Sequence, residues 1–232
     1  GVAHLQGRLP AAVEDRLDGV RAVDPVERVV ELCTDGVEGV AVGGSPWLLA
    51  GYVGWSAFVV VTMANSTNVS DGMDGLMSGL TLLAAVTLAA TMLTGLVPFD
   101  RGPVQPGAVM AGAVFCASLG GASLGFLVYN RYPARVFMGD VGSLALGGGL
   151  GMAGIVAGAE VLLPVAGMVF LLELASSLLQ IFAFHVLGRT ILPIAPVHHI
   201  FEKKGWDEPT VVLLFYVSGA ICAFATITLA GL

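Results

Sequence analysis

Long apolar stretches alternate with short polar connections from residue 47 to the C-terminus. A transmembrane helix needs about 20 predominantly apolar residues, and each stretch is close to that length. The pattern predicts six spans, at about 47–64, 76–96, 108–129, 141–159, 161–187 and 210–230. The expected fold class is all-α, a polytopic transmembrane helical bundle.

Two of these spans carry residues that predict how they pack. The stretch 141–159 is rich in Gly and Ala, which favours close contact between helices. The stretch 161–187 contains Pro164, which predicts a kink or break because proline removes a helix hydrogen bond. Polar side chains are embedded further along the same stretch, at Glu173, Ser176, Ser177 and Gln180.

Residues 1–46 have a different character from the rest of the chain. They lack an uninterrupted apolar core, so they do not read as a signal peptide. Segments 12–21 and 25–33 mix apolar and charged residues, as short amphipathic helices do. We expect 1–46 to be an extracytoplasmic loop or linker with short amphipathic helices, and 47–232 to be the transmembrane part.

Composition supports a membrane protein. Hydrophobic residues make up 56% and charged residues 12% of the chain, with a mean hydropathy of +0.88. A soluble domain usually has about twice that share of charge. The net charge of −7 argues against nucleic acid as a partner. Cys33, Cys116 and Cys222 are scattered and show neither metal-ligand spacing nor a disulfide framework.

Basic residues predict the orientation. Connections 65–75, 130–140 and 188–209 lie on one side of the predicted bundle, and the connection 97–107 lies on the other. The first side carries Arg131, Arg135, Arg189, Lys203 and Lys204. The short connections of the second side contain only Arg101. By the positive-inside rule the first side is cytoplasmic.

The first cytoplasmic connection contains a spaced polar set. Its members lie three residues apart, at Asn65, Asn68, Asp71 and Asp74. On a helix or helix-like turn such side chains share one side, so they could converge on one ligand. Carboxylates at a membrane boundary are costly unless something compensates them. The alternative is a helix cap by Ser70 or Asp71, but the spacing of the whole set favours a site.

The second connection places Asp140 between Gly139 and Gly142, just ahead of a predicted span. A carboxylate at a helix N-terminus could simply cap the helix and favour its dipole. Equally, the two glycines could let a phosphate approach free backbone N–H groups. The residues alone leave both interpretations open.

The third connection contains the adjacent pair His198 and His199, followed by Lys203 and Lys204. Adjacent side chains point in different directions, so the pair is a weak metal motif. Hydrogen bonding to a phosphate or nucleotide fits better, with the lysines supplying charge. The alternative is an ordinary interfacial loop whose Lys and Trp206 anchor at lipid headgroups.

Taken together, the three connections offer carboxylates, amides, histidines and lysines without thiol ligands. This set is typical of a Mg²⁺–phosphate site rather than a zinc site. On the cytoplasmic face of a membrane protein, such a site could join a soluble phosphorylated substrate to a lipid.

These three connections resemble signature loops of the polyprenyl-phosphate N-acetylhexosamine-1-phosphate transferases. The similar segments are 65–75, 129–143 with Phe-Met-Gly-Asp-Val-Gly-Ser, and 196–206. The paired His and Glu-Lys-Lys-Gly-Trp of the third segment resemble the phospho-MurNAc-pentapeptide translocase branch. The resemblance covers roughly 47–230.

The resemblance implies an activity and its partners. The reaction would transfer phospho-MurNAc-pentapeptide from UDP-MurNAc-pentapeptide to undecaprenyl phosphate with Mg²⁺, giving lipid I and UMP. The protein would lie in the bacterial cytoplasmic membrane among membrane lipids, and a homodimer is a candidate assembly. Alternatives are a related UDP-sugar transferase, an inactive fragment, or an ion-coupled transporter with Glu173 and Gln180 in its path.

The resemblance also implies roles for individual residues. The catalytic acids would be Asp71, Asp74 and Asp140. Asp140 would bind Mg²⁺, and Asp71 would lie beside the metal, assisting catalysis or deprotonating the lipid phosphate. Asn68 and Asn130 would fix the pyrophosphate or neighbouring groups. The remaining substrate-binding residues would be Asn65, Gly72, Met73, Phe137, Gln180, His198 and His199. Of these, Gly72 and Met73 would line the uridine pocket with Asp74, while Phe137 stacks on uracil.

Two features depart from the family pattern. Family members have about ten spans, and an earlier cytoplasmic loop carries an Asp-Asp pair needed for activity. We therefore expect an N-terminal third to be missing from this sequence and the 232 residues alone to be inactive. The usual third histidine is Ile200 here, which leaves the identity of the UDP-sugar donor open.

Overall fold

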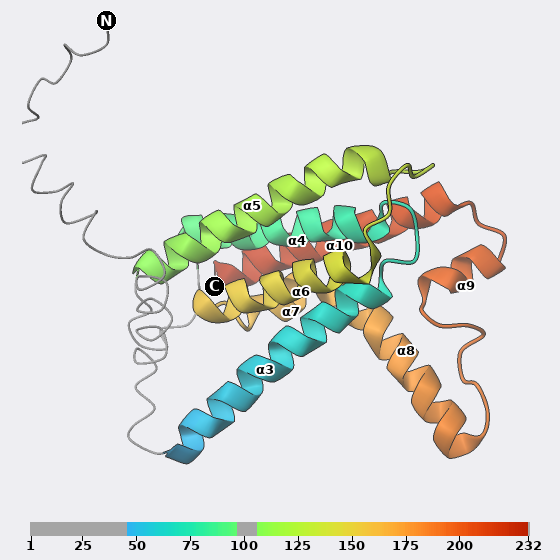
Figure 1. The fold of residues 1–232 in the computed structure, drawn as a ribbon, viewed down its shortest axis with the longest axis horizontal. Helices are drawn as coiled ribbons and strands as arrows, with labels where there is room; N and C mark the ends of the chain where they lie inside the picture. The colour runs from blue at the N-terminus through green and yellow to red at the C-terminus, as the bar shows by residue number, and fades with distance from the viewer. Residues whose placement is uncertain (1–45, 97–105, 232) are drawn as a thin grey trace, which may run out of the picture.

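The computed structural model describes residues 46–96 and 106–231. All regular structure in these residues is helical (Figure 1). The helices are α3 (Pro46–Val69), α4 (Leu76–Leu93), α5 (Pro106–Asn130), α6 (Gly139–Val156), α7 (Leu162–Ala166), α8 (Met168–Leu187), α9 (His198–Lys203) and α10 (Glu208–Ala230). The expectation for residues 1–45 lies outside the described residues, as does Arg101.

Six helices of the described part are long and apolar enough to cross a membrane: α3, α4, α5, α6, α8 and α10. The predicted fold class is therefore confirmed. α3 runs further than predicted, to Val69, so Asn65 and Asn68 lie on the helix itself. The hydroxyls of Ser66 and Thr67 donate back to main-chain carbonyls one turn earlier, which lets these polar residues continue the helix.

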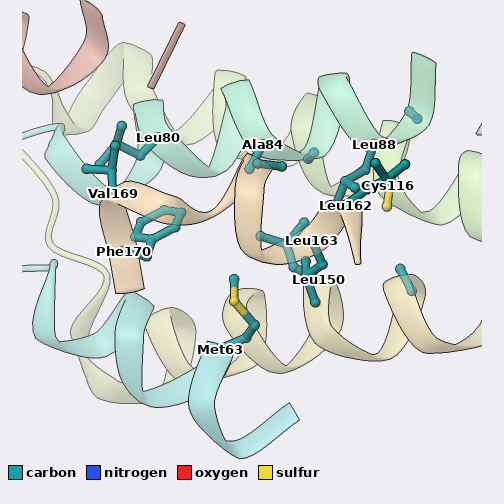
Figure 2. Close-up of a cluster of buried hydrophobic side chains, with 14 of the residues drawn as sticks. Met63, Leu80, Ala84, Leu88, Cys116, Leu150, Leu162, Leu163, Val169 and Phe170 are labelled. Atoms are coloured by element: carbon teal, nitrogen blue, oxygen red, sulfur yellow. The ribbon is translucent and has the colours of Figure 1, made fainter. Parts of the chain in front are cut away.

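α4 is the central helix, and it is far more buried than the other five candidate spans. It packs against α5 and α10 along its length. Its side chains Leu80, Ala84 and Leu88 meet the core residues Leu162 and Phe170 from α7 and α8 (Figure 2). The core thus gathers around α4 and fixes where its N-terminal end lies.

Glycines on α6 bring it against α3. A Cβ at Gly147 would lie 2.5 Å from the main-chain oxygen of Met63, and one at Gly151 would lie 3.0 Å from the Cα of Val60. Only a residue without a side chain allows two backbones to approach so closely. The predicted close packing of this Gly-rich stretch is confirmed, and it holds the first turn of α6 beside the last turn of α3.

The predicted break in the fifth apolar stretch is also confirmed. α7 ends at Ala166 and α8 begins at Met168, with Gly167 between them, shortly after Pro164. α8 then runs away from α4, α5 and α10 (Figure 1). The buried residues of α8 lie mostly in its first half, and most side chains beyond Ser176 are exposed. The break therefore leaves the start of α8 in the bundle and directs its end outward.

Candidate active site

The three connections predicted to be cytoplasmic meet at one end of the bundle. Hydrogen bonds join residues that are far apart in the sequence: the end of α3 bonds to the start of α6, and the turn after α3 bonds to the start of α10. The segments 70–75, 131–138 and 188–207 all lie at this end (Figure 1). The convergence that the sequence predicted is therefore present.

The last turn of α3 contacts the first turn of α6. The Nδ2 of Asn68 donates to Oδ1 of Asp140 at 3.2 Å and to the hydroxyl of Ser143 at 3.0 Å. The hydroxyl of Thr67 donates to the main-chain oxygen of Ser143 at 2.8 Å. These bonds fix the exposed Asp140 carboxylate beside the amide of Asn68.

Asp71 lies in the turn that follows α3. Its pKa is raised from 3.8 to about 6, first by burial and then by the negative charge of Asp140. Burial and a like charge both disfavour the ionised carboxylate, and a cation beside the two acids would offset that cost. Neither acid forms a side-chain cap, since the N-cap residues of α4 and α6 are Gly75 and Met138 and neither helix has a side-chain capping bond. Asp140 does lie in the first turn of α6, where the helix dipole favours a carboxylate.

Asp74 holds neighbouring segments together. Its Oδ2 accepts from the backbone N–H of Ala134 at 2.8 Å. Its own backbone N–H donates to Oε1 of Glu208, at the start of α10, at 2.6 Å. Asp74 therefore ties the turn to both of the other connections. Its predicted catalytic role stays a prediction.

Asn130 is also engaged within the protein. Its Oδ1 accepts from the backbone N–H of Gly75 and the hydroxyl of Ser78, and its Nδ2 donates to the carbonyl of Val136. Gly75 has φ +80, in the left-handed region that favours glycine, and its carbonyl accepts from the Tyr216 hydroxyl at 2.7 Å. The buried Asn130 thus organises the entrance to α4, and its predicted contact with pyrophosphate remains untested.

His198 and His199 point to different partners, as predicted. His198 is fully buried, and its Nδ1 lies 2.9 Å from Oε2 of Glu173. Its other nitrogen faces Gly72, since a Cβ on that glycine would lie 2.6 Å from Nε2. His199 is partly exposed and pairs instead with Glu202 on the same short helix.

The other predicted residues are distributed around this end of the bundle. Phe137 is 76% exposed, which leaves its ring free to stack, whereas Met73 is buried. Gln180 accepts from the backbone N–H groups of residues 191 and 192 and donates to the carbonyl of Leu192. Asn65 is exposed, and its Nδ2 donates to the carbonyl of Val61 within α3. Gln180 and Asn65 are therefore not joined to Asp71 and Asp140 by these bonds.

The carboxylates of this site match what Mg²⁺ requires only in part. Within residues 46–96 and 106–231, no group of three or more His, Cys, Asp or Glu side chains is gathered as a ready-made metal site. Mg²⁺, however, is usually held by one or two carboxylates together with waters and substrate phosphates. Asp140 and the neighbouring Asp71 fit that pattern, with the amide of Asn68 in contact with Asp140.

Comparison with known proteins places the chain in a family. The profile of glycosyl transferase family 4 matches residues 43–158, half of the chain, including Asp71 and Asp140. This chain belongs to glycosyl transferase family 4.

Three relatives of this chain are each named phospho-N-acetylmuramoyl-pentapeptide-transferase. The protein of Pelagibacter ubique is 43% identical over 175 residues, covering 74% of this chain and 48% of its own. Those of Desulforudis audaxviator and Moorella thermoacetica are 39% and 41% identical, covering 78% and 80% of this chain. The matched region is 50% of the Desulforudis protein and 55% of the Moorella protein. The chain thus spans about half the length of the curated relatives it matches.

Ser143 and Glu208 had no predicted role at this site, and Glu173 was considered only for the path of an ion-coupled transporter. Ser143 lies in the segment that carries the resemblance, yet only the fold shows that it contacts Asn68. Glu208 directly follows Asp207 in the sequence, and nothing in that acidic pair indicates which of the two contacts Asp74. Glu173 stands out as an acid in an apolar stretch, a signal that points to a partner but does not name His198.

Proposed function

We propose that this chain provides the Mg²⁺–phosphate side of an enzyme that transfers phospho-MurNAc-pentapeptide from UDP to undecaprenyl phosphate, giving lipid I and UMP. The observation that carries the proposal is the meeting of Asn68, Asp71 and Asp140 at the ends of candidate membrane spans. The names of the three relatives support the same reaction.

Asp140 and Asp71 would hold Mg²⁺. The exposed Asp140 is fixed by Asn68. The pKa of Asp71 is raised first by burial and then by the charge of Asp140, and a bound cation would offset both costs of ionising it. When bound, the ion would neutralise charge on the transferring phosphates, which is what phosphoryl transfer mainly demands of a protein. The residues themselves orient the phosphates and hold the acids at fixed positions.

The UDP portion would lie near the turn 72–74, with Phe137 stacking on the uracil ring. The exposure of Phe137 fits this role, because a ring already packed in the core could not accept a base. Undecaprenyl phosphate would approach from the membrane, so that its phosphate meets Asp71 at the boundary. By the positive-inside rule this boundary is cytoplasmic, in the bacterial inner membrane.

Two of the alternatives bear on this proposal. A transporter would use Glu173 as a residue of an ion path, but its carboxylate is paired with the buried His198. Ile200 occupies a position where the family usually has histidine. The donor is therefore tested against a second UDP-sugar. The homodimer stays a prediction.

The test is lipid I formation from UDP-MurNAc-pentapeptide and undecaprenyl phosphate with Mg²⁺. The chain is assayed in bilayers, alone and co-expressed with the N-terminal half of the Moorella relative. We expect Mg²⁺-dependent release of UMP only in the co-expressed sample, and more with this donor than with UDP-GlcNAc. Asp140→Asn should abolish it, because a lost metal carboxylate costs several kcal/mol in the transition state. UMP release in the co-expressed sample that survives Asp140→Asn would refute the role of this acid. No release from the co-expressed wild type would contradict the proposed function.

A further inference from the structure

Glu173 is a buried acid in an apolar helix. It is the sixth residue of α8, a candidate membrane span, and it is 1% exposed. Such a carboxylate is unfavourable unless a partner compensates it. Its Oε2 lies 2.9 Å from Nδ1 of His198, while Oε1 has no hydrogen-bond partner among the described residues. The acid therefore depends on a histidine 25 residues further along the chain.

His198 is enclosed on several sides. Its ring is 0% exposed and meets the edge of Phe215 at a centroid distance of 6.5 Å. Its Nε2 faces Gly72 and has no hydrogen-bond partner within the described segments. The ring therefore stands between the start of α8 and the turn that carries Asp71.

The carboxylate decides how this ring is held. A carboxylate only accepts hydrogen bonds, so in a Glu173 carboxylate–His198 pair Nδ1 of His198 is the donor. Partners of this kind fix both the tautomer and the rotation of an imidazole. With the rotation fixed, Nε2 leaves room only for glycine at residue 72, because a Cβ there would lie 2.6 Å from Nε2.

We propose that Glu173 is a positioning residue, which acts by holding His198 against Gly72 and so sets the position of the turn beside Asp71. The other long-range contacts of this turn, from Asn130, Ala134, Glu208 and Tyr216, act at residues 74 and 75. The His198 contact reaches Gly72, in the half of the turn next to Asp71. Its consequence for nucleotide binding rests on the proposed function; the geometric part does not.

A double variant separates a role of the Glu173–His198 pair in stability from its role in positioning the turn. Replacing both members of a buried ionic pair by apolar residues is often neutral for stability. The double variant Glu173→Leu with His198→Phe should therefore fold about as stably as wild type. If the pair positions the turn, this stable variant still has an altered turn.

The geometric test is solid-state NMR of the 232-residue chain in bilayers, with labelled histidine and glycine. In wild type, the His198 ring should show a hydrogen on Nδ1 bonded to a carboxylate, a signal that disappears in His198→Phe. Glu173→Leu should abolish that bond and shift the Gly72 amide. Glu173→Gln, which keeps an acceptor oxygen, should retain most of the wild-type pattern. The matched control is Ser176→Ala, which removes a buried hydroxyl that bonds only to the Glu173 carbonyl of its own helix.

The functional test is a mutant cycle on UDP binding with Mg²⁺. Glu173→Leu should weaken UDP binding at least tenfold, and should add nothing further in a His198→Phe background, because both changes remove the same support. Independent, additive losses would overturn the inference, as would a His198 ring and Gly72 amide unchanged by Glu173→Leu. Wild type that binds no UDP would count against the proposed function, while the NMR result would still decide the inference.

Discussion

The contact between α3 and α6 gives the sharpest test of how the fold builds the site. Gly147 and Gly148 are neighbours on α6, but a Cβ at Gly147 would lie 2.5 Å from the Met63 carbonyl and 2.8 Å from the Cα of Ala64. A Cβ at Gly148 would meet nothing within 4 Å. The two glycines therefore form a matched pair for the same substitution.

The magnitude follows from the backbone contacts. Main-chain atoms cannot rotate away, so Gly147→Ala must push α6 from α3 by about 1 Å to reach ordinary contact distance. Overpacking of this kind costs about 1–3 kcal/mol of stability. Because Asn68 and Asp140 bridge the same two helices, the shift should also separate them. A misplacement of about 1 Å at a catalytic site can cost about 100-fold in rate.

Gly148→Ala should instead be neutral or stabilising by up to about 1 kcal/mol, since alanine favours a helix over glycine. The measurements are the thermal midpoint in detergent and the Mg²⁺ affinity by titration calorimetry, followed by UMP release in the co-expressed sample. Gly147→Ala that matches Gly148→Ala in stability and in Mg²⁺ affinity would refute the argument that close α3–α6 contact positions the acids.

Three further predictions concern the site. Mg²⁺ needs the ionised Asp71, whose pKa is about 6, so Mg²⁺ affinity should be steady above pH 7 and fall about tenfold per pH unit below 6. Asp71→Asn should remove most of this dependence. Phe137→Ala should weaken UDP binding by about 1–3 kcal/mol in calorimetry, with undecaprenyl phosphate binding nearly unchanged. A cysteine at Ala134, in a variant lacking the native cysteines, should react with a membrane-impermeant thiol reagent only after the cytoplasmic face is opened.

Each of these has a result that contradicts it. A Mg²⁺ affinity that stays flat between pH 7 and pH 5 would show that Asp71 does not meet the ion. Equal losses for UDP and the lipid after Phe137→Ala would point to misfolding and not to stacking. Labelling of the Ala134→Cys variant in intact cells would reverse the orientation.

Much of the architecture could be predicted from residue types and spacing. Apolar stretches near the length of a bilayer must become helices, because a spanning backbone has to satisfy its hydrogen bonds internally. Gly147 and Gly151 in an apolar stretch indicate close packing, and Pro164 indicates a break, since both act through local backbone chemistry. The segments that carry the site were also identifiable from residue types. Asp71 and Asp140 are carboxylates at the ends of apolar stretches, where a charge is costly unless a partner or ligand compensates it.

The tertiary structure alone decided which polar groups face one another. Asn68 and Asp140 are 72 residues apart, and Asp74 and Glu208 are 134 apart, so no local pattern can pair them. It also showed that Asp74, predicted from its spacing and from the resemblance, and Asn130 and Gln180, predicted from the resemblance, each hold neighbouring segments together. Hydrogen-bond partners depend on where helices end in space, and that is set by how α5, α6 and α10 pack on α4 and how α3 packs on α6.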